Sequence, residues 1–318
     1  MDDRLCFVQF LHPGGEHEPD AGRVKTWNRR DHRRKFLKSP GRFLETPSAQ
    51  VQDGEIVFWG EWEPESVAVV EIGTPLPDGP RWIYEPYFVL PEGDPDQAWY
   101  SGRQNTDPFV FGDRFRYTGC LQHTKRGPTQ LRHLARASVI LFGSCREESR
   151  FVVDTVFVVA DHIDHTKRDH QGRLRSRVPA TYEAVTLAPW YVNTDDPTRS
   201  HRLYTGATFD ARVEGMFSFF PCLPYSLAPR GFARPTIRLP GIITDTHRQW
   251  VRLNPQLSTA DVAPLWEEVV RQVTDQGLML GIGAPLPPAA AADQYGIEQA
   301  RISDIVNGRL EHPSLDRL

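Results

Sequence analysis

The chain has few cysteines and no long apolar run, and each of these shortages excludes a class of protein. Four cysteines (Cys6, Cys120, Cys145 and Cys222) are scattered over 318 residues without a CxxC pair, which argues against a zinc ribbon and against a disulfide framework. No stretch approaches the roughly 18 consecutive apolar residues that cross a bilayer. The opening MDDRLCFVQF also lacks the basic and apolar regions of a signal peptide. We therefore expect a cytoplasmic protein with no membrane partner.

A basic excess is also missing from the chain as a whole. The formal net charge is -4, with 37 Lys and Arg against 41 Asp and Glu, whereas nucleic-acid-binding proteins usually carry an excess of positive charge. However, residues 23–38 contain eight Lys and Arg and one Asp, so this segment carries +7 and the rest of the chain -11. A cluster this dense indicates an anionic counterpart such as phosphate. The alternative is a solvated surface, or pairing with acidic loops of the same protein.

Residues of this basic segment are the candidates for binding phosphate and nucleic acid. Aromatic and amide side chains alternate with the charges, as in proteins that stack bases and hold the backbone at the same time. The candidates are Trp27, Asn28, Arg29, Arg30, His32, Arg33, Arg34 and Lys35.

A glycine turn lies just before this segment. The apolar residues 6–11 predict a strand, which leads into HPGGEH at residues 12–17, and a glycine turn after a strand lets backbone amides approach a ligand. His12, Glu16 and His17 flank the turn and are the candidate acid–base catalytic groups. Because this spacing cannot place all three on one helical face, the pattern predicts no metal site. The sequence identifies no cofactor.

The pattern of apolar residues predicts an α+β protein that is rich in β-structure. Residues 1–160 form a β-rich domain, in which the continuous apolar runs at 139–142 and 156–160 are typical of strands buried on both faces. The polar segment 161–181 is predicted to be a loop or junction. Residues 182–318 form a second β-rich half with C-terminal helices, which either stands alone or shares one core with the first.

Three helices are expected. A short one covers residues 127–137. A longer one begins at Ser258 or Thr259, where a capping pattern is present, and ends at Gly277. A third, with Ile297, Ile302 and Ile305 on one face, follows the low-complexity linker APLPPAAAA.

The segment 115–159 resembles the PUA-like barrel domains, including their EVE and ASCH members. It contains FRYTGCLQHT, then a short helix, a strand that ends in Gly143 and Ser144, and a second strand. In this respect it is similar to the nucleotide-modification-associated proteins encoded by phages and bacteria, whose setting is DNA modification and phage defence. The resemblance covers about 45 of the 318 residues.

This resemblance implies a PUA-like barrel core with peripheral helices and a pocket for a nucleobase or modified nucleotide. It places Tyr117, Cys120, Gly143 and Ser144 near that pocket, and Arg146 follows the turn. The alternative is an ordinary β-hairpin in which Cys120 is a small buried hydrophobe.

The leading hypothesis is recognition of a nucleotide or of a base in nucleic acid, with a modification or processing step left open. A second hypothesis is an NAD-utilising transferase of the ADP-ribosyltransferase type, because Tyr204 precedes Phe217 and Ser218 in a similar outline. In a third, the protein is a non-enzymatic adaptor whose residues 23–38 dock an acidic protein partner. The Asp- and His-rich residues 161–170 are interpreted as solvated surface.

Overall fold

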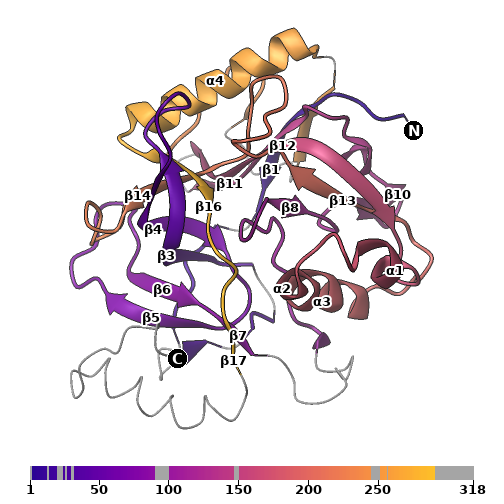
Figure 1. The fold of residues 1–318 in the computed structure, drawn as a ribbon, viewed down its shortest axis with the longest axis horizontal. Helices are drawn as coiled ribbons and strands as arrows, with labels where there is room; N and C mark the ends of the chain where they lie inside the picture. Colours follow the sequence, from indigo (N-terminus) through magenta and orange to yellow (C-terminus); the bar gives the residue numbers. More distant parts are fainter. Residues whose placement is uncertain are drawn as a thin grey trace.

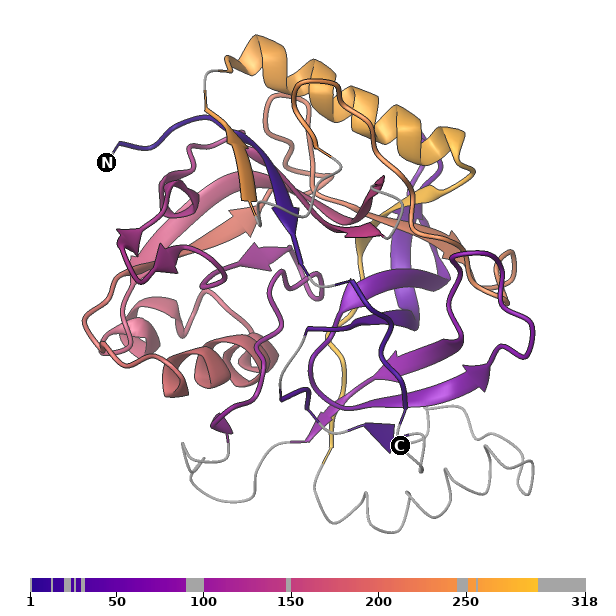
Figure 2. The same ribbon diagram turned by 180° about the vertical axis from the view of Figure 1, so that it is seen from behind.

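A computed structural model describes residues 2–12, 14–19, 24–25, 27–29, 32–89, 100–146, 150–244, 251–255 and 257–290. These residues form two β-sheets with helices at the periphery (Figures 1 and 2). The expectation of a β-rich α+β protein is therefore confirmed. None of the described helices is both long and apolar enough to cross a membrane.

The first sheet has six strands and is buried on both faces at its centre. In spatial order its strands are β15 (Val251–Asn254), β1 (Phe7–Leu11), β11 (Val139–Arg146), β12 (Arg150–His165), β13 (His201–Gly206) and β8 (Arg116–Tyr117). The pair β1 and β11 is parallel, and the other pairs are antiparallel. Residues 139–142 are fully buried, with alternate side chains in two different apolar clusters, so the prediction of a doubly buried strand is confirmed.

The second sheet has seven strands and curls at one end. In spatial order its strands are β16 (Met279–Gly283), β14 (Phe220–Pro224), β4 (Gln52–Glu61), β3 (Arg34–Leu44), β6 (Trp82–Pro86), β5 (Ser66–Glu71) and β2 (Val24–Lys25). The curl arises because β16 pairs with β14 and also with the end of β3. Two short ladders complete the described strands: β7 (Phe88–Val89) with β17 (Ala289–Ala290), and β9 (His123–Thr124) with β10 (Gly127–Pro128).

The sheets of the described residues do not close into a barrel at the place where the sequence predicts one. Residues 115–159 contribute β8, β11 and β12 to the six-stranded sheet, whose two outer strands, β15 and β8, are not paired with each other. Strand β8 has only two residues and pairs only with β13 in this sheet, so it forms an edge of the sheet.

The two predicted halves are interlocked rather than separate. Strand β12 continues past residue 160 to His165, whereas the sequence predicts a loop from residue 161 onward. Strands β14 and β16 of the second half pair with β4 and β3 of the first, and both apolar clusters draw residues from each half. The halves therefore share one core.

The helices lie outside the sheets. Helix α4 (Thr259–Asp275) is capped by Ser258 and Asp261 and crosses one end of the molecule (Figure 1), so the prediction of this helix is confirmed. The short helices α1 (His170–Leu174), α2 (Ala180–Tyr182) and α3 (Ala188–Val192), with a π-helical turn at Glu183–Leu187, gather beside β13. The expected helix at 127–137 is only a 3-10 turn over Gln130–His133. The expected helix with Ile297 lies outside the described residues.

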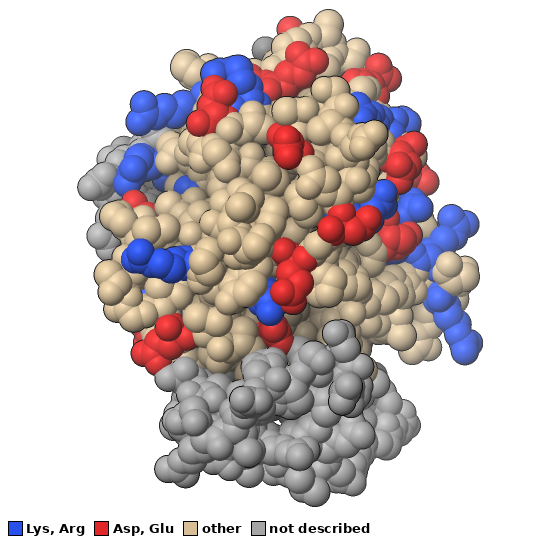
Figure 3. All heavy atoms as spheres, turned by 60° about the vertical axis from the view of Figure 1, so that its left-hand side comes forward, with Lys and Arg blue, Asp and Glu red and all other residues tan. Residues whose placement is uncertain are grey.

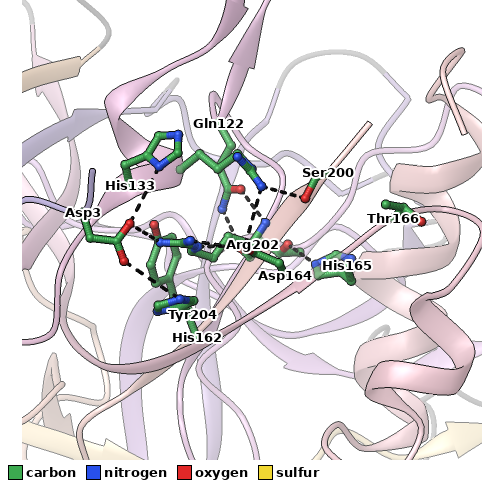
Figure 4. Close-up of polar contacts among 12 residues, drawn as sticks. Asp3, Gln122, His133, His162, Asp164, His165, Thr166, Ser200, Arg202 and Tyr204 are labelled. Carbon is green, nitrogen blue, oxygen red and sulfur yellow. Dashed lines mark hydrogen bonds and ion pairs between the residues drawn. The ribbon is translucent and has the colours of Figure 1, made fainter. Parts of the chain in front are cut away.

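A polar cluster fastens the N-terminus to the first sheet (Figure 4). The guanidinium of Arg202 in β13 donates to Asp3 at 2.7 Å and to Asp164 at 2.8 Å, while the side-chain amide of Gln122 bonds both backbone groups of Arg202. His162 lies 4.0 Å from Asp3. The Asp- and His-rich segment thus makes specific contacts along a strand and is not merely solvated.

Two buried histidines lie opposite each other on β12 and β13. His165 and His201 are cross-strand partners, each about 1% exposed. His165 bonds Thr118 and Tyr191, whereas neither ring nitrogen of His201 has a hydrogen-bond partner among the described residues. Burial, followed by the charge of His170, lowers the pKa of His165 to about 3. Burial, followed by the charges of His123 and His165, lowers that of His201 to about 3.

We predict that His201 makes the stability of the protein depend on pH. An unfolded histidine has a pKa of about 6.5, so between pH 6.5 and pH 3 the unfolded chain binds more protons at this position than the folded chain. The stabilisation is complete above pH 6.5 and is lost as the pH falls. The free energy of unfolding of the wild type, relative to His201→Leu, should fall by about 2 kcal/mol between pH 7.5 and pH 5.

Urea unfolding at several pH values measures this difference, and other titrating groups cancel in the comparison. Trp190→Phe is the control, since Trp190 packs against the His201 ring at 5.5 Å and does not titrate. A difference between wild type and His201→Leu that stays constant with pH would contradict the prediction.

Candidate functional site

A network of buried ionisable groups lies where the two sheets meet. Its six central members come from the segment after β1, from residues at the start of β3 and at the end of β4, and from β12. The members are His12, His32, Arg34, Glu61, Glu63 and Asp154, with Ser144 of β11 and Arg234 at its edge. Below, we call these eight residues the junction network.

Glu61 is the centre of the junction network. Its Oε2 accepts from His12 Nδ1 at 2.6 Å and from Arg34 Nη1 at 2.9 Å, and its Oε1 lies 3.3 Å from His32 Nδ1. His32 Nδ1 also lies 2.8 Å from Glu63 Oε1. Glu63 Oε2 in turn accepts from the Asn28 amide. One carboxylate thus joins two histidines and an arginine.

A second chain of contacts joins Glu61 to the first sheet. The Arg34 Nε donates to Asp154 Oδ2 at 2.7 Å, and Arg234 Nη1 lies 3.6 Å from Asp154 Oδ1. Arg234 Nη1 also donates to Ser144 Oγ at 2.8 Å, and Arg234 Nη2 donates to the Gly14 carbonyl. Arg234 therefore holds the segment after β1 against Ser144, two places that the sequence predicts to bear on ligand binding. Ser144 lies within β11, which continues to Arg146 and pairs with β12 there, so the strand does not end in a turn at Gly143 and Ser144 as the sequence predicts.

Burial and charge act in opposite directions on the junction network. Burial lowers the pKa of His12 despite the neighbouring Glu61 carboxylate. Burial also acts to lower the pKa of His32, but Glu63 and Glu61 together raise it to about 11. Burial acts to raise the pKa of Glu61, yet His12, Arg34 and His32 hold it well below its usual range. The His12 and His32 rings stack on each other beside Glu61, with centroids 5.5 Å apart and planes 4° from parallel.

A second group of buried titratable residues adjoins Glu61, since the Asp107 backbone N–H lies 3.4 Å from Glu61 Oε1. Burial raises the pKa of Asp107 well above its usual range, and the Asp107 carboxyl accepts from the backbone N–H groups of Thr118 and Cys120. Burial likewise raises the pKa of Cys120 and of Tyr117 well above their usual ranges, so neither ionises at neutral pH. The Tyr117 hydroxyl donates to the Cys120 carbonyl at 2.6 Å.

The predicted base pocket is mostly core. Tyr117 is fully buried and its ring contacts Phe142 and Tyr204. Gly143 is needed because a side chain there would meet the Val152 carbonyl at 2.0 Å, so this glycine serves strand pairing. Ser144 alone among the described side chains of this set joins the junction network, through Arg234. The Arg146 side chain lies outside the described residues.

The predicted phosphate-binding residues divide into buried and exposed groups. Arg34 and Lys35 are about 1% and 0% exposed. Arg34 is paired with Glu61 and Asp154, and the Lys35 ammonium donates to the Pro64 carbonyl at 2.6 Å. Their prediction as surface phosphate ligands is therefore wrong, because the acids that neutralise the segment belong to the same chain. Asn28 and His32 likewise turn toward Glu63.

The other members of that set have different positions. The Trp27 ring is buried against Tyr100 at 6.0 Å, so it is not free to stack on a base. Arg29 and Arg33 are exposed. Arg30 lies outside the described residues. On the face drawn in Figure 3, basic and acidic side chains are interspersed, so the described charges there form no single basic surface.

Of the three predicted catalytic residues, only His12 joins the junction network. The Glu16 carboxylate accepts from Arg81 Nε at 3.0 Å and from the Arg81 backbone at 2.7 Å. His17 is buried, with its ring against Tyr84 at 5.8 Å. The segment after β1 thus directs these three side chains to three different places.

The residues behind the NAD hypothesis are structural. The Tyr204 hydroxyl donates to the Leu131 carbonyl and accepts from the Leu134 N–H, and the Ser218 hydroxyl accepts from the Val158 N–H at 2.9 Å. Phe217 packs against Trp266 of α4. These side chains hold the core together and form no part of the junction network.

A cavity of about 360 Å³ adjoins the junction network at Arg234. Asp78, Arg150, Gln276 and Thr236 supply polar groups to its wall, and Val152, Phe232 and Leu278 supply apolar ones. The Arg150 guanidinium lies 3.3 Å from Asp78. The Arg234 guanidinium lies over the Trp59 ring, 5.0 Å from its centroid. A ligand in this cavity would meet two arginines and an apolar wall.

Sequence reasoning missed Glu61, Glu63, Asp154 and Arg234. The signal for the first two was present, because FWGEWEPES places three acids, Glu61, Glu63 and Glu65, on alternate positions after an apolar strand, and alternate positions of an extended chain share a face. Asp154 interrupts the apolar run of β12, and a lone acid at such a position is rarely buried unless it is paired. Arg234 carried no signal in the sequence.

Comparison with known proteins gives no relative. No protein-family model, no curated protein and no solved structure matches this chain.

We predict that Asp154 is essential to the fold because it neutralises two buried arginines. Removing one partner of a buried ion pair leaves an unpaired charge, which costs about 3–5 kcal/mol. Asp154→Ala should lower the free energy of unfolding by this amount in urea. In the Asp154→Ala variant, Arg34→Met should lower the free energy of unfolding by less than it does in the wild type, because the Arg34 charge has already lost the Asp154 carboxylate as a partner.

Asp78→Ala provides the control, because the exposed pair of Asp78 with Arg150 should contribute at most about 1 kcal/mol. Strict additivity of Asp154→Ala and Arg34→Met would show that the two side chains are not coupled.

Proposed function

We propose that the protein recognises a nucleotide, or a base within nucleic acid, in the cavity beside Arg234, and that the junction network is the place where a modification or processing step would occur. The observation that carries the proposal is the position of Arg234. This one side chain lines the cavity and also bonds Ser144 and the Gly14 carbonyl next to Asp154.

The cavity suits a ligand that combines anionic oxygens with a flat apolar face. The Arg150 guanidinium, whose side chain is 38% exposed, can bind phosphate in a bidentate manner. Arg234 is buried and already donates to Ser144 and to the Gly14 carbonyl, so it adds positive charge to the inner wall. Phe232, Val152 and Leu278 offer an apolar surface against which a base could lie. A volume of about 360 Å³ lies within the range of roughly 300–1,000 Å³ that is usual for small-molecule sites.

His12 and His32 are the candidate catalytic residues. Both contact Glu61, which orients them, and the His32 side chain is the more exposed of the two, at 18% against 6%. Buried ionisable groups arranged around one carboxylate are common at functional sites, although structural networks share this feature. His32 is thus the member of this pair best placed to meet a ligand.

The PUA-like relationship of residues 115–159 belongs to the same proposal. Its support is Ser144, which the resemblance implies to be near a base and which contacts Arg234 at the edge of the cavity. The exposed Arg29 and Arg33 would extend binding from a free nucleotide to a nucleic-acid backbone. Salt should therefore weaken the binding of an oligonucleotide more strongly than the binding of a single nucleotide.

We predict that nucleotides stabilise the protein and that Arg150 is needed for this effect. A ligand that binds only the folded state raises the apparent melting temperature. Thermal denaturation with nucleoside mono-, di- and triphosphates, NAD and short oligonucleotides identifies the ligand, and calorimetry gives its affinity. Arg150→Ala should weaken binding at least about tenfold, which corresponds to roughly 1.4 kcal/mol.

Arg212→Ala is the matched control. The Arg212 guanidinium stacks on the exposed side of Phe209, 4.4 Å from the ring centroid, and does not line the cavity. A protein that none of these ligands stabilises, or an Arg150→Ala variant with unchanged affinity, would contradict the proposal. Recovery of an acidic protein, without nucleotide or nucleic acid, in a pull-down would favour the adaptor hypothesis in its place.

A further inference from the structure

His32, Glu61 and Glu63 converge at one point of the junction network because of strand register. In the antiparallel ladder of β3 and β4, Arg34 lies opposite Glu61. Extending the same register by two residues on each strand brings His32 opposite Glu63, and residues two apart on a strand share a face. One nitrogen of His32 and one oxygen from each carboxylate lie within 4.8 Å of one another.

Both carboxylates are oriented in the same way. Their Oε1 atoms face His32 Nδ1, at 3.3 Å for Glu61 and 2.8 Å for Glu63. Their Oε2 atoms face away and are held by a surrounding layer of donors, which are His12 and Arg34 on Glu61 and Asn28 on Glu63. Metal-binding carboxylates characteristically have this second layer of hydrogen bonds, which orients the oxygen that faces the metal. Glu61 Oε1 has in addition the Asp107 backbone N–H at 3.4 Å.

Burial distinguishes these carboxylates from ordinary surface acids. Glu61 and Glu63 are only 5% and 0% exposed, and a buried carboxylate is costly unless it is paired or bound to a metal. The His32 side chain is 18% exposed and forms the open side of the group. Three protein ligands with one open side are the usual composition of a catalytic metal site, where water or substrate completes the coordination shell.

We propose that His32 Nδ1, Glu61 Oε1 and Glu63 Oε1 form a binding site for one divalent transition-metal ion. One imidazole and two carboxylates suit Mn²⁺, Fe²⁺ or Zn²⁺. This site goes beyond nucleotide recognition and does not require it, because no residue of the cavity wall is a ligand.

The test is metal binding by the full-length chain after treatment with a chelator and desalting. Calorimetry with Zn²⁺ and electron paramagnetic resonance with Mn²⁺ should show one bound ion per chain. Glu63→Gln and His32→Asn should each weaken binding at least about 100-fold. Asn28→Ala, which removes only the donor to the free oxygen of Glu63, should weaken it by about 10- to 100-fold.

Glu65→Gln is the matched control. Glu65 is also buried and lies two residues from Glu63, but its carboxylate faces the Val89 N–H, so this variant should bind the ion with unchanged affinity. Circular dichroism checks that each variant is folded. Asn28→Ala keeps all three ligands and provides the test if removal of a ligand prevents folding.

Absence of saturable binding to the wild type up to millimolar Zn²⁺ and Mn²⁺ would overturn the proposal, as would unchanged affinity in both Glu63→Gln and Asn28→Ala. The two proposals can fail separately. Nucleotide binding measured in the presence of chelator tests the cavity alone, and Arg150→Ala should leave metal binding unchanged.

Discussion

The fold depends on a buried arginine that two sheets share. Arg34 begins β3 of the second sheet, and its guanidinium reaches Glu61 at the end of β4 and Asp154 in the middle of β12 of the first sheet. All three side chains are at most 5% exposed. Because a charge in this position is strongly destabilising without its partners, the distance and angle between the sheets are fixed by the geometry of one guanidinium. Apolar packing could hold the sheets together at several orientations, whereas two charge-assisted hydrogen bonds from one planar group allow few.

The same constraint explains why the chemically interesting residues lie together. Once Arg34 holds Glu61 in place, the neighbouring positions of β3 and β4 bring His32 and Glu63 to the same face. The parallel pairing of β1 with β11 brings His12, just after β1, beside Gly143 and Ser144 of β11. Gly14 allows this last approach, since a side chain there would meet the Ser144 hydroxyl oxygen at 2.2 Å. Replacing a buried ionic network by apolar residues of similar size often increases stability. The charges at this junction therefore fix the geometry of the two sheets more than they add to stability.

Local features of the chain could be predicted from the sequence, and long-range contacts could not. The doubly buried strand at residues 139–142 and helix α4 follow from apolar runs and a capping box, which are properties of adjacent residues. The partners of Arg34 in the basic segment are distant in the sequence, with Glu61 27 positions away and Asp154 120 positions away. Register decides such contacts, and a shift of one residue would turn every side chain to the other face. Of the predicted site residues, His12, His32 and Ser144 join one network: His12 follows β1, His32 precedes β3, and Ser144 lies within β11. Glu16 and His17 turn elsewhere along an irregular segment.

The positive charge of the basic segment is largely balanced by acids of the same chain once the chain is folded. Along the chain, residues 23–38 carry +7 and suggest an external anion. In the fold, Arg34 faces Glu61 and Asp154, Lys38 lies 3.2 Å from Glu55 and 3.3 Å from Glu85, and His32 faces Glu63. The acids that balance the segment come from strands that pair with it or pack on it, so much of the apparent excess is internal pairing. What remains for a ligand is the chemistry at the edges of this pairing. Arg234 lines the cavity. His32, next to its two carboxylates, offers a partly exposed position. A site built in this way would respond to a ligand through its effect on buried charges, because any group that binds there must replace a hydrogen bond or a proton that the protein already holds.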